Sequence, residues 1–387
     1  MMNWMAQERC RILFVTSFDT RLIDSVNTDG SMIRLLKDFL RVYEDMCDLF
    51  LFTGDTRKFE LAPTVEHVPS AFFQRFGLWH LSYAVLSAFK IARRLKGNSL
   101  VRGFCAACPG AILAAKIKRK PSIVFYEYNW AYQVTYVNKG RVIGTVARLI
   151  EDYVIKNANV VVTRNESLEK ELHQRGAKRV AIIPLTFDLD VFRPGLRVTE
   201  LKKRYGIRDE KILMFIGRLH PVKRLDLLLK AVRQLDIKFK LFIVGTGELE
   251  DELKEIAKSL GVADKVLFTG AVPYSDVPRF MNMADLMVMT SSIEGQPRVL
   301  IEAMSCGTPA VGTNVFGIRD TIIDGVTGYL TSDDPATIAK QISKALENEA
   351  LPQMCRSVAL TKYSRTECAS KEKALFKELL GLDNQQG

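Results

Sequence analysis

Short runs rich in β-branched and aromatic residues alternate with helical patterns from one end of this chain to the other. Among the helical patterns are Ser31–Tyr43, Leu225–Gln234 and Leu249–Leu260, the last followed by Gly261, as is common at a helix C-terminus. Such alternation predicts parallel sheets with helices on both faces, where ligands bind beyond the carboxyl ends of the strands. The predicted strands are Arg11–Val15, Leu49–Phe52, Leu100–Phe104, Ser122–Tyr126, Val160–Val162, Val180–Ile183, Ile212–Ile216, Lys240–Val244, Lys265–Phe268, Leu286–Met289 and Thr308–Gly312.

A break in this alternation divides the chain into two predicted domains. Prolines, aspartates and a glycine cluster from Thr186 to Val198, and the pattern restarts at Ile212. A chain of 387 residues is too long for one ordinary core and long enough for two α/β domains. We predict a first domain over residues 1–185, a linker over 186–200 and a second domain over 201–364. A final helix and tail over 365–387 are expected to cross back to the first domain.

From the sequence we expect neither a secretion signal nor a membrane span. Its first apolar run, Ile12–Val15, reads as a strand and not as a signal peptide, and no stretch approaches the ~20 apolar residues of a membrane span. Seven cysteines, an odd number without a secretory signal, are typical of reduced thiols in the cytoplasm. Cys105 and Cys108 have CxxC spacing, but no second pair lies nearby to complete a zinc site. We therefore expect a cytoplasmic protein.

The net charge of +11 is unevenly distributed. Between His67 and Tyr126 there is no aspartate or glutamate, and aromatic residues accompany the cations. Such a segment suits an anionic partner, namely a membrane surface at the inner face or a phosphorylated acceptor, while a solvated helix face with inward-packed aromatics explains it equally well. Nucleic acid is not expected, because no nucleic-acid-binding module accompanies the charge. The cations are Arg75, Lys90, Arg93, Arg94, Lys96, Arg102, Lys116, Lys118, Arg119 and Lys120.

The most informative segment follows the predicted strand Leu286–Met289. Glu294 lies in the loop after this strand, and Glu302 lies within the helix that begins near Pro297. A carboxylate pair around a free helix N-terminus can hold sugar hydroxyls while the backbone N–H groups take a phosphate. The donor-binding candidates between the two glutamates are Gly295, Gln296, Pro297, Arg298 and Val299.

This segment resembles the Glu-x7-Glu signature of the large retaining glycosyltransferase family 4, and the resemblance is densest from Phe215 to Leu330. It implies the GT-B fold, an α/β architecture in which two doubly wound Rossmann-like domains face each other across a cleft. The C-terminal domain would bind a nucleotide-sugar, and the N-terminal domain would bind the acceptor. By the same resemblance, Glu294 contacts the donor sugar near the reacting carbon, and Glu302 holds the ribose hydroxyls of the nucleotide.

A second element, Phe215–Arg224, directly follows a predicted strand. Gly217 lets the chain turn tightly, while Arg218 and Lys223 can converge on one pyrophosphate, Arg as a bidentate fork and Lys as a point charge. The family carries Gly-Arg-Leu-x3-Lys-Gly here, which implies that both cations neutralise the leaving diphosphate. Arg224 replaces the usual glycine. We expect no metal requirement, because no residue arrangement obviously supplies a divalent metal in place of these cations.

Two glycine-containing segments complete the predicted donor site. Gly245 and Gly247 follow the next strand, but Glu250 stands where a dinucleotide fingerprint requires a third glycine, which argues against a dehydrogenase. The family carries a similar Gly-x-Gly at the nucleotide face. Thr269 and Gly270 resemble the family segment that borders the base.

The N-terminal half is expected to hold the acceptor. Gly30 precedes a helical pattern, where family members often carry two glycines, and could let the backbone approach the donor phosphate or the acceptor. Glu127 and Asn129 follow the strand Ser122–Tyr126, where many relatives place a histidine or an acidic dipeptide. Acceptor contact and a purely structural role both fit these two residues.

We therefore expect a retaining glycosyltransferase that moves a sugar from a nucleotide-sugar to a glycan, a lipid-linked or another envelope polysaccharide acceptor. Arg218 and Lys223 would stabilise the departing diphosphate electrostatically. The alternative is a non-catalytic protein of the same fold that binds a sugar nucleotide or an anionic polymer. An epimerase or a phosphorylase of this architecture is not favoured, since neither a carboxylate-and-histidine constellation nor a much longer chain is present.

Overall fold

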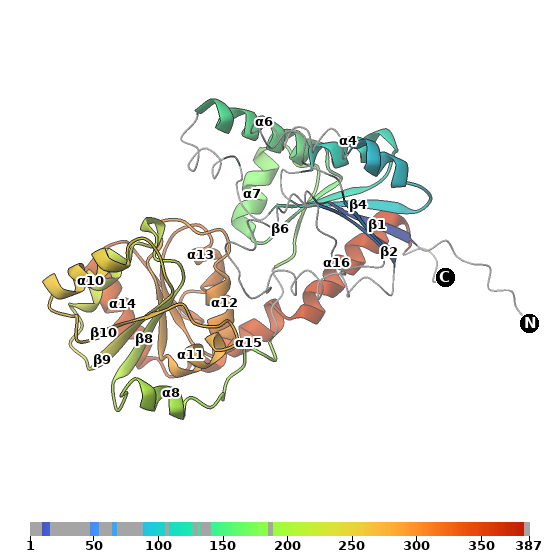
Figure 1. Ribbon diagram of the computed structural model, residues 1–387. Helices are drawn as coiled ribbons and strands as arrows, with labels where there is room; N and C mark the ends of the chain where they lie inside the picture. The colour runs from blue at the N-terminus through green and yellow to red at the C-terminus, as the bar shows by residue number, and fades with distance from the viewer. Residues whose placement is uncertain are drawn as a thin grey trace, which may run out of the picture. The chain divides into compact units, whose positions relative to one another are not determined.

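A computed structural model of the chain describes residues 10–15, 47–53, 64–67, 88–104, 108–126, 131, 141–184 and 189–382. The chain divides into two compact units, one of residues 1–183 with 369–387 and the other of residues 184–368. Each unit contains one parallel sheet with helices packed on it (Figure 1).

The first unit is built on a seven-stranded sheet with the order β3-β2-β1-β4-β5-β6-β7. Its central strands are buried along their whole length, as β5 and β6 show, which is typical of a parallel sheet covered on both faces. The strands are β1 (Cys10–Val15), β2 (Cys47–Thr53), β3 (Thr64–His67), β4 (Ser99–Phe104), β5 (Ser122–Tyr126), β6 (Val160–Thr163) and β7 (Val180–Ile182). The described helices include α4 (Pro109–Ile117), α6 (Arg141–Asn157) and α7 (Glu166–Gln174).

The C-terminal helix α16 (Arg365–Leu380) contributes to this first unit from residue 369 onward. Its Glu372 accepts a hydrogen bond from Nε of Arg102 on β4 at 2.9 Å, and both side chains are buried. Further along the helix, Glu378 forms an exposed ion pair with Arg179. The predicted return of the final helix to the first domain is confirmed.

The second unit is built on a six-stranded parallel sheet with the order β10-β9-β8-β11-β12-β13. Its strands are β8 (Lys211–Ile216), β9 (Phe239–Val244), β10 (Val266–Gly270), β11 (Leu286–Met289), β12 (Ala310–Thr313) and β13 (Gly328–Thr331). Its helices are α8 (Thr199–Arg204), α9 (Leu225–Val232), α10 (Glu250–Ser259), α11 (Val277–Met283), α12 (Arg298–Ser305), α13 (Ile318–Thr321), α14 (Pro335–Glu347) and α15 (Leu351–Lys362), with a 3₁₀ turn at Pro221–Lys223.

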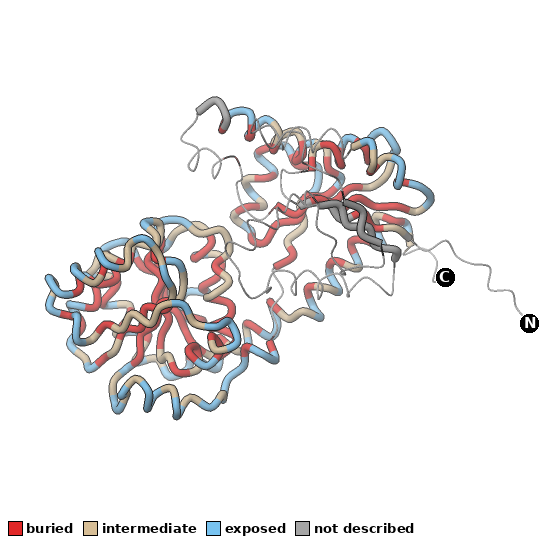
Figure 2. Tube along the Cα trace, viewed as in Figure 1, coloured by how far each residue is buried: buried red, intermediate tan, exposed pale blue. Residues whose placement is uncertain are grey.

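Side chains of β8 alternate between two cores, one on each face of this sheet. Leu213 and Phe215 belong to one core, and Ile212 and Met214 belong to the other. Buried residues line the strands of both units, while exposed residues follow the outer sides of the helices (Figure 2). The loops that leave the carboxyl ends of the strands are thus anchored on two packed layers.

The predicted α/β architecture of two domains, each built on a parallel sheet, is confirmed, but some elements were missed. The strand Gly328–Thr331 has only four residues and begins with a glycine, so it resembles a loop in sequence. A Cβ atom at Gly328 would lie 1.8 Å from the carbonyl oxygen of Ala310, which explains why the strand starts with glycine. The predicted helix Ser31–Tyr43 lies outside the described residues.

Over the part of the chain that the structure describes, none of the helices combines the length and the apolar character needed to cross a membrane.

Candidate functional site

An ion pair joins two loops at the carboxyl ends of adjacent strands in the second unit. Lys223 ends the 3₁₀ turn after β8, and Glu294 lies in the loop after β11. Nζ of Lys223 lies 2.5 Å from Oε1 of Glu294, and both side chains are largely but not fully buried, at 23% and 13% exposure. The hydroxyl of buried Ser291 donates a second hydrogen bond to the same oxygen at 2.6 Å. The carboxylate of Glu294 is thereby held in one orientation.

Backbone contacts hold these two loops together. The N–H of Ser292 donates to the carbonyl oxygen of Val222 at 2.8 Å, and the hydroxyl of Thr290 donates to the carbonyl oxygens of Lys223 and Arg224 at 3.0 Å. The Lys223–Glu294 pair therefore rests on rigid supports and does not depend on its own attraction alone.

A third loop packs behind Glu294. Gly317 has φ +81°, and a Cβ atom there would lie 2.3 Å from the carbonyl oxygen of Gly295 and 2.6 Å from that of Glu294. Only glycine can approach this backbone so closely. Asp320 accepts a hydrogen bond from the N–H of Gly317 at 3.2 Å. The loop after β12 thus sets the position of the loop that carries Glu294.

The second signature glutamate has a different environment. Glu302 lies on α12, is 5% exposed, and accepts a hydrogen bond from the hydroxyl of Tyr274 at 2.8 Å. Burial raises the pKa of Glu302 above its ordinary value, while Arg298 and the Tyr274 hydrogen bond act to lower that pKa. The ring of Tyr274 packs edge-on against Phe192, with centroids 5.6 Å apart. Two carboxylates with distinct partners therefore flank the start of α12.

The start of α12 and its preceding loop hold the other donor-binding candidates. Pro297 is the N-cap residue of α12 and provides no side-chain cap, so the first N–H groups are not satisfied from that position. Oε1 of Gln296 is buried without a hydrogen-bond partner. Val299 is half-buried, in the first turn of the helix.

Gly245 and Gly247 bring the loops after β8 and β9 into direct backbone contact. A Cβ atom at Gly245 would lie 2.0 Å from the carbonyl oxygen of Gly217, and one at Gly247 would lie 2.1 Å from that of Leu219. The N–H of Gly245 donates to the carbonyl oxygen of Gly270 at 2.9 Å. Packing between loops thus requires these glycines, a role that the sequence pattern did not indicate. Their predicted contact with a nucleotide stays a prediction.

In the loop after β8, one residue departs from the family pattern. Arg224 has φ +48° and ψ +47°, the left-handed conformation that glycine adopts most readily, and glycine is the usual family residue there. Its guanidinium forms an ion pair with Asp333 at 2.8 Å. Arg218 is exposed in the same loop, and Thr269 is half-buried at the end of β10. Lys223 and Glu294 are two predicted site residues whose side chains contact each other directly.

Tyr274 and Ser291 belong to the site but were not predicted from the sequence. Tyr274 contacts Glu302 only because the fold brings two separate segments together, whereas Ser291 contacts Glu294 from three residues earlier in the same loop. The sequence feature that could have indicated Tyr274 is its position a few residues beyond the strand that ends in Thr269–Gly270. The feature that could have indicated Ser291 is its position three residues before Glu294.

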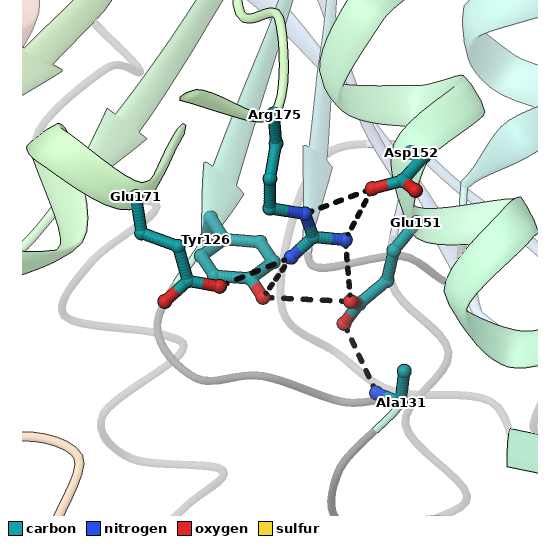
Figure 3. Close-up of polar contacts among 6 residues, drawn as sticks. All are labelled: Tyr126, Ala131, Glu151, Asp152, Glu171 and Arg175. Atoms are coloured by element: carbon teal, nitrogen blue, oxygen red, sulfur yellow. Dashed lines mark hydrogen bonds and ion pairs between the residues drawn. The ribbon is translucent and has the colours of Figure 1, made fainter. Parts of the chain in front are cut away.

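The first unit contains a buried polar cluster around Arg175, the C-cap residue of α7 (Figure 3). Its guanidinium contacts Glu151 at 2.9 Å and Asp152 at 2.7 Å, both on α6, and Glu171 at 3.4 Å. Nη1 of Arg175 also donates to the hydroxyl of Tyr126 at 2.8 Å. One cation thereby joins three carboxylates and the last residue of β5.

Glu151 also contacts both ends of the segment that follows β5. Its Oε1 accepts a hydrogen bond from the N–H of Ala131 at 3.2 Å, and its Oε2 lies 3.5 Å from the hydroxyl of Tyr126 (Figure 3). Two of the predicted acceptor contacts, Glu127 and Asn129, fall between these anchors and lie outside the described residues, as does the third, Gly30.

Within the described ranges, His, Cys, Asp and Glu side chains nowhere gather in groups of three or more that could hold a metal ion. Metal independence stays a prediction.

Comparisons with known proteins show a family match within the second unit and a fold match over nearly the whole chain. The family model for "Glycosyl transferases group 1" matches residues 198–361. N-acetyl-alpha-D-glucosaminyl L-malate synthase of Bacillus anthracis is 34% identical over 203 residues, covering 51% of this chain and 52% of that protein. D-inositol 3-phosphate glycosyltransferase of Geodermatophilus obscurus is 33% identical over 230 residues, covering 55% and 50%. The chain spans about half the length of these curated relatives.

Solved structures resemble the chain over nearly its full length. Anabaena Alr3699/HepE in complex with UDP has a TM-score of 0.75 at 19% identity, covering 95% of this chain and 100% of that chain. WaaG, a glycosyltransferase involved in lipopolysaccharide biosynthesis, has a TM-score of 0.67 at 17% identity, covering 96% and 100%. At these identities the likeness establishes the two-domain fold.

Proposed function

We propose that this chain is a GT-B glycosyltransferase, with residues 198–361 as its glycosyl transferases group 1 domain, and that it transfers a sugar from a nucleotide-sugar donor. In this proposal the second unit binds the donor. The transfer retains the anomeric configuration and requires no metal ion.

The observation that carries the proposal is the Lys223–Glu294 pair. An ammonium group has three N–H donors, and Glu294 takes one of them, so the remaining donors are available to diphosphate oxygens. Arg218, exposed on the same loop, adds a guanidinium with a geometry that suits phosphate. Cations fixed beside the departing diphosphate stabilise the negative charge that develops there. Glu294, held by Lys223 and Ser291, orients the donor sugar.

The buried Glu302 carboxylate suits the nucleoside. A carboxylate offers about four acceptor positions, and the Tyr274 hydroxyl occupies one, which leaves room for vicinal ribose hydroxyls. The unpartnered Gln296 oxygen and the uncapped start of α12 supply further polar groups for the sugar or the phosphate. UDP-sugars are the first donors to test, because similar structures contain UDP or UDP-glucose.

The acceptor is proposed to be a glycan or a lipid-linked saccharide of an envelope polysaccharide. A lipid-linked acceptor lies at a membrane surface, which would bring the enzyme to the inner face of that membrane. The relatives' names refer to malate and to inositol phosphate, while one structural neighbour is described as acting in lipopolysaccharide biosynthesis. This variety supports treating the acceptor separately from the donor.

The test compares Glu294→Ala with Glu349→Ala, an exposed glutamate between α14 and α15. We expect Glu294→Ala to abolish release of nucleoside diphosphate while nucleotide binding survives, and Glu349→Ala to change neither. If no nucleotide-sugar is turned over although one binds, the alternative of a non-catalytic sugar-nucleotide-binding protein replaces the proposal. The anomeric configuration of the product, measured by NMR, tests retention, and activity in EDTA tests metal independence.

A further inference from the structure

Large apolar side chains are exposed on three helical segments of the first unit. In the described part of this unit, every exposed large apolar side chain lies on residues 88–94, on α4 or on α6. Their exposed fractions are high for such side chains: Phe89 75%, Leu113 43%, Ile117 67%, Val146 45% and Leu149 64%. Single exposed apolar residues are ordinary, but five on neighbouring helices indicate an interaction surface.

These side chains lie on outward faces that adjoin one another. Leu113 and Ile117 are four residues apart on α4, and Val146 and Leu149 are three apart on α6, so each pair shares one helix face. α4 and α6 pack together, and Nζ of Lys116 donates to Oδ1 of an asparagine at the end of α6 at 2.9 Å. Both helices cover the same face of the sheet (Figure 1).

Topology puts residues 88–94 on that face as well. The strand order β3-β2-β1-β4-β5-β6 means that the connections β3→β4, β4→β5 and β5→β6 all run across the sheet in one direction. Right-handed crossovers in one direction place their helices on the same face. Phe89 therefore belongs with the apolar side chains of α4 and α6, and we call this surface the α4–α6 face.

Among the described residues, the exposed charges on the α4–α6 face are positive. Exposed cations accompany the apolar side chains: Arg93, Arg94, Lys116, Lys118, Arg119 and Arg148. The described residues 88–104 and 108–126 contain no carboxylate. The acidic residues of α6, Glu151 and Asp152, both bind Arg175 in the buried cluster (Figure 3). The described part of this surface thus combines apolar side chains with a concentration of cations.

We propose that the α4–α6 face docks on an anionic lipid bilayer. The apolar side chains enter the boundary between headgroups and acyl chains, and the cations meet the headgroup phosphates. A second copy of the chain fits less well, because a symmetric dimer would bring the same cations against each other. A polyanion would match the cations but leave Phe89, Ile117 and Leu149 in water.

Docking on a membrane would give the enzyme access to a lipid-linked acceptor, and only this biological role of the docking rests on the proposed function. Binding to vesicles can be measured without donor or acceptor, so either proposal can fail alone.

The experiment is flotation of the full chain with vesicles of phosphatidylcholine alone or with phosphatidylglycerol added at three parts in ten, at low and at high salt. We expect binding to the anionic vesicles that weakens as salt rises, and little binding to phosphatidylcholine. No preference for the anionic vesicles would overturn the proposal.

An apolar triple variant tests insertion: Phe89→Ser, Ile117→Ser and Leu149→Ser. We expect it to lower vesicle binding at least about tenfold, because partial burial of each side chain contributes a few-fold. Its control replaces exposed apolar residues of the second unit, Val191→Ser with Leu360→Ser, and should retain binding within about twofold. Unchanged melting temperatures verify that both variants remain folded.

A charge triple variant tests the headgroup contacts: Arg93→Gln, Lys118→Gln and Arg119→Gln. Each cation near an anionic surface contributes about fivefold, so we expect a loss of roughly a hundredfold. The control carries the same change of net charge on exposed lysines of the second unit, Lys203→Gln, Lys258→Gln and Lys340→Gln. An equal loss of vesicle binding in the control would show that only the net charge of the protein matters, and it would overturn the assignment of binding to the α4–α6 face.

Two results would assign the face to another partner and overturn the proposal. One is a dimer in light scattering that the apolar triple dissociates, without vesicle binding. The other is binding to a polyanion as tight as to vesicles and insensitive to the apolar triple.

Discussion

Replacing Gly317 by alanine would place a methyl group against the backbone that carries Glu294. The new Cβ atom would lie 2.3 Å from the carbonyl oxygen of Gly295, whereas real Cβ atoms essentially never approach within 3.0 Å. The two loops must therefore separate by at least about 0.7 Å. The positive φ of +81° adds backbone strain, so we expect a loss of about 1–3 kcal/mol in the free energy of unfolding.

The larger effect is expected on turnover. A displacement on the order of 1 Å in a group that positions substrate costs about a hundredfold in rate. We therefore expect Gly317→Ala to lower the rate of nucleoside diphosphate release by about ten- to a hundredfold, because Glu294 moves relative to Lys223. Binding of free nucleoside diphosphate should change much less.

Gly261→Ala is the matched control. Gly261 also has a positive φ, +68°, but no atom lies within 4 Å of its Cβ position. It should lose about 1 kcal/mol of stability and no activity. Both variants are followed by thermal unfolding and by nucleoside diphosphate release. Wild-type turnover in a folded Gly317→Ala variant would refute the assignment of this loop as the support of Glu294.

Three further predictions concern individual charges. Lys223→Met should weaken nucleoside diphosphate binding at least about tenfold in calorimetry, since a charge-assisted hydrogen bond is lost. Burial raises the pKa of Glu302 from 4.5 because the folded protein favours the neutral carboxyl. The contribution of Glu302 to the free energy of unfolding is therefore fully present below pH 4.5 and is lost as pH rises through the raised pKa. Nucleotide affinity should rise over the same range as the carboxylate ionises, and Tyr274→Phe should shift the midpoint upward because it removes a hydrogen bond that lowers the pKa. Arg175→Met should cost about 3–5 kcal/mol of stability in denaturant unfolding, because it leaves buried carboxylates without their cation, whereas Arg179→Met, from an exposed pair with α16, should cost under about 1 kcal/mol.

The strand–helix order around Glu294 was readable from the sequence. The strand Leu286–Met289 was predicted with its observed bounds, because its four apolar residues are bounded by polar ones on either side. The helix was predicted to begin near Pro297, and α12 begins at Arg298, since proline suits the start of a helix and not its interior. Local pattern was sufficient here.

Contacts between distant segments were not readable. Tyr274 and Gly317 matter because the fold brings them against Glu302 and Gly295, and no local spacing encodes those pairings. Ser291 is different, because it lies only three residues before Glu294. The glycines at 245 and 247 were predicted to contact a ligand, which stays a prediction, and the structure adds a packing role against the loop after β8. A glycine pattern indicates that another group approaches the backbone closely, but it does not distinguish a ligand from another loop of the protein.

The most direct test of the account is a thermal-shift measurement of the intact chain, in EDTA, against UDP-, GDP- and ADP-sugars. A ligand at a hundred times its dissociation constant stabilises the native state by about 2.7 kcal/mol, which corresponds to a rise of about 5–10 °C for a domain of this size. We predict such a rise with the sugars of one nucleotide, and its loss in a variant that combines Arg218→Ala with Lys223→Ala. The absence of any shift with every nucleotide-sugar, or an undiminished shift in the double variant, would contradict the account.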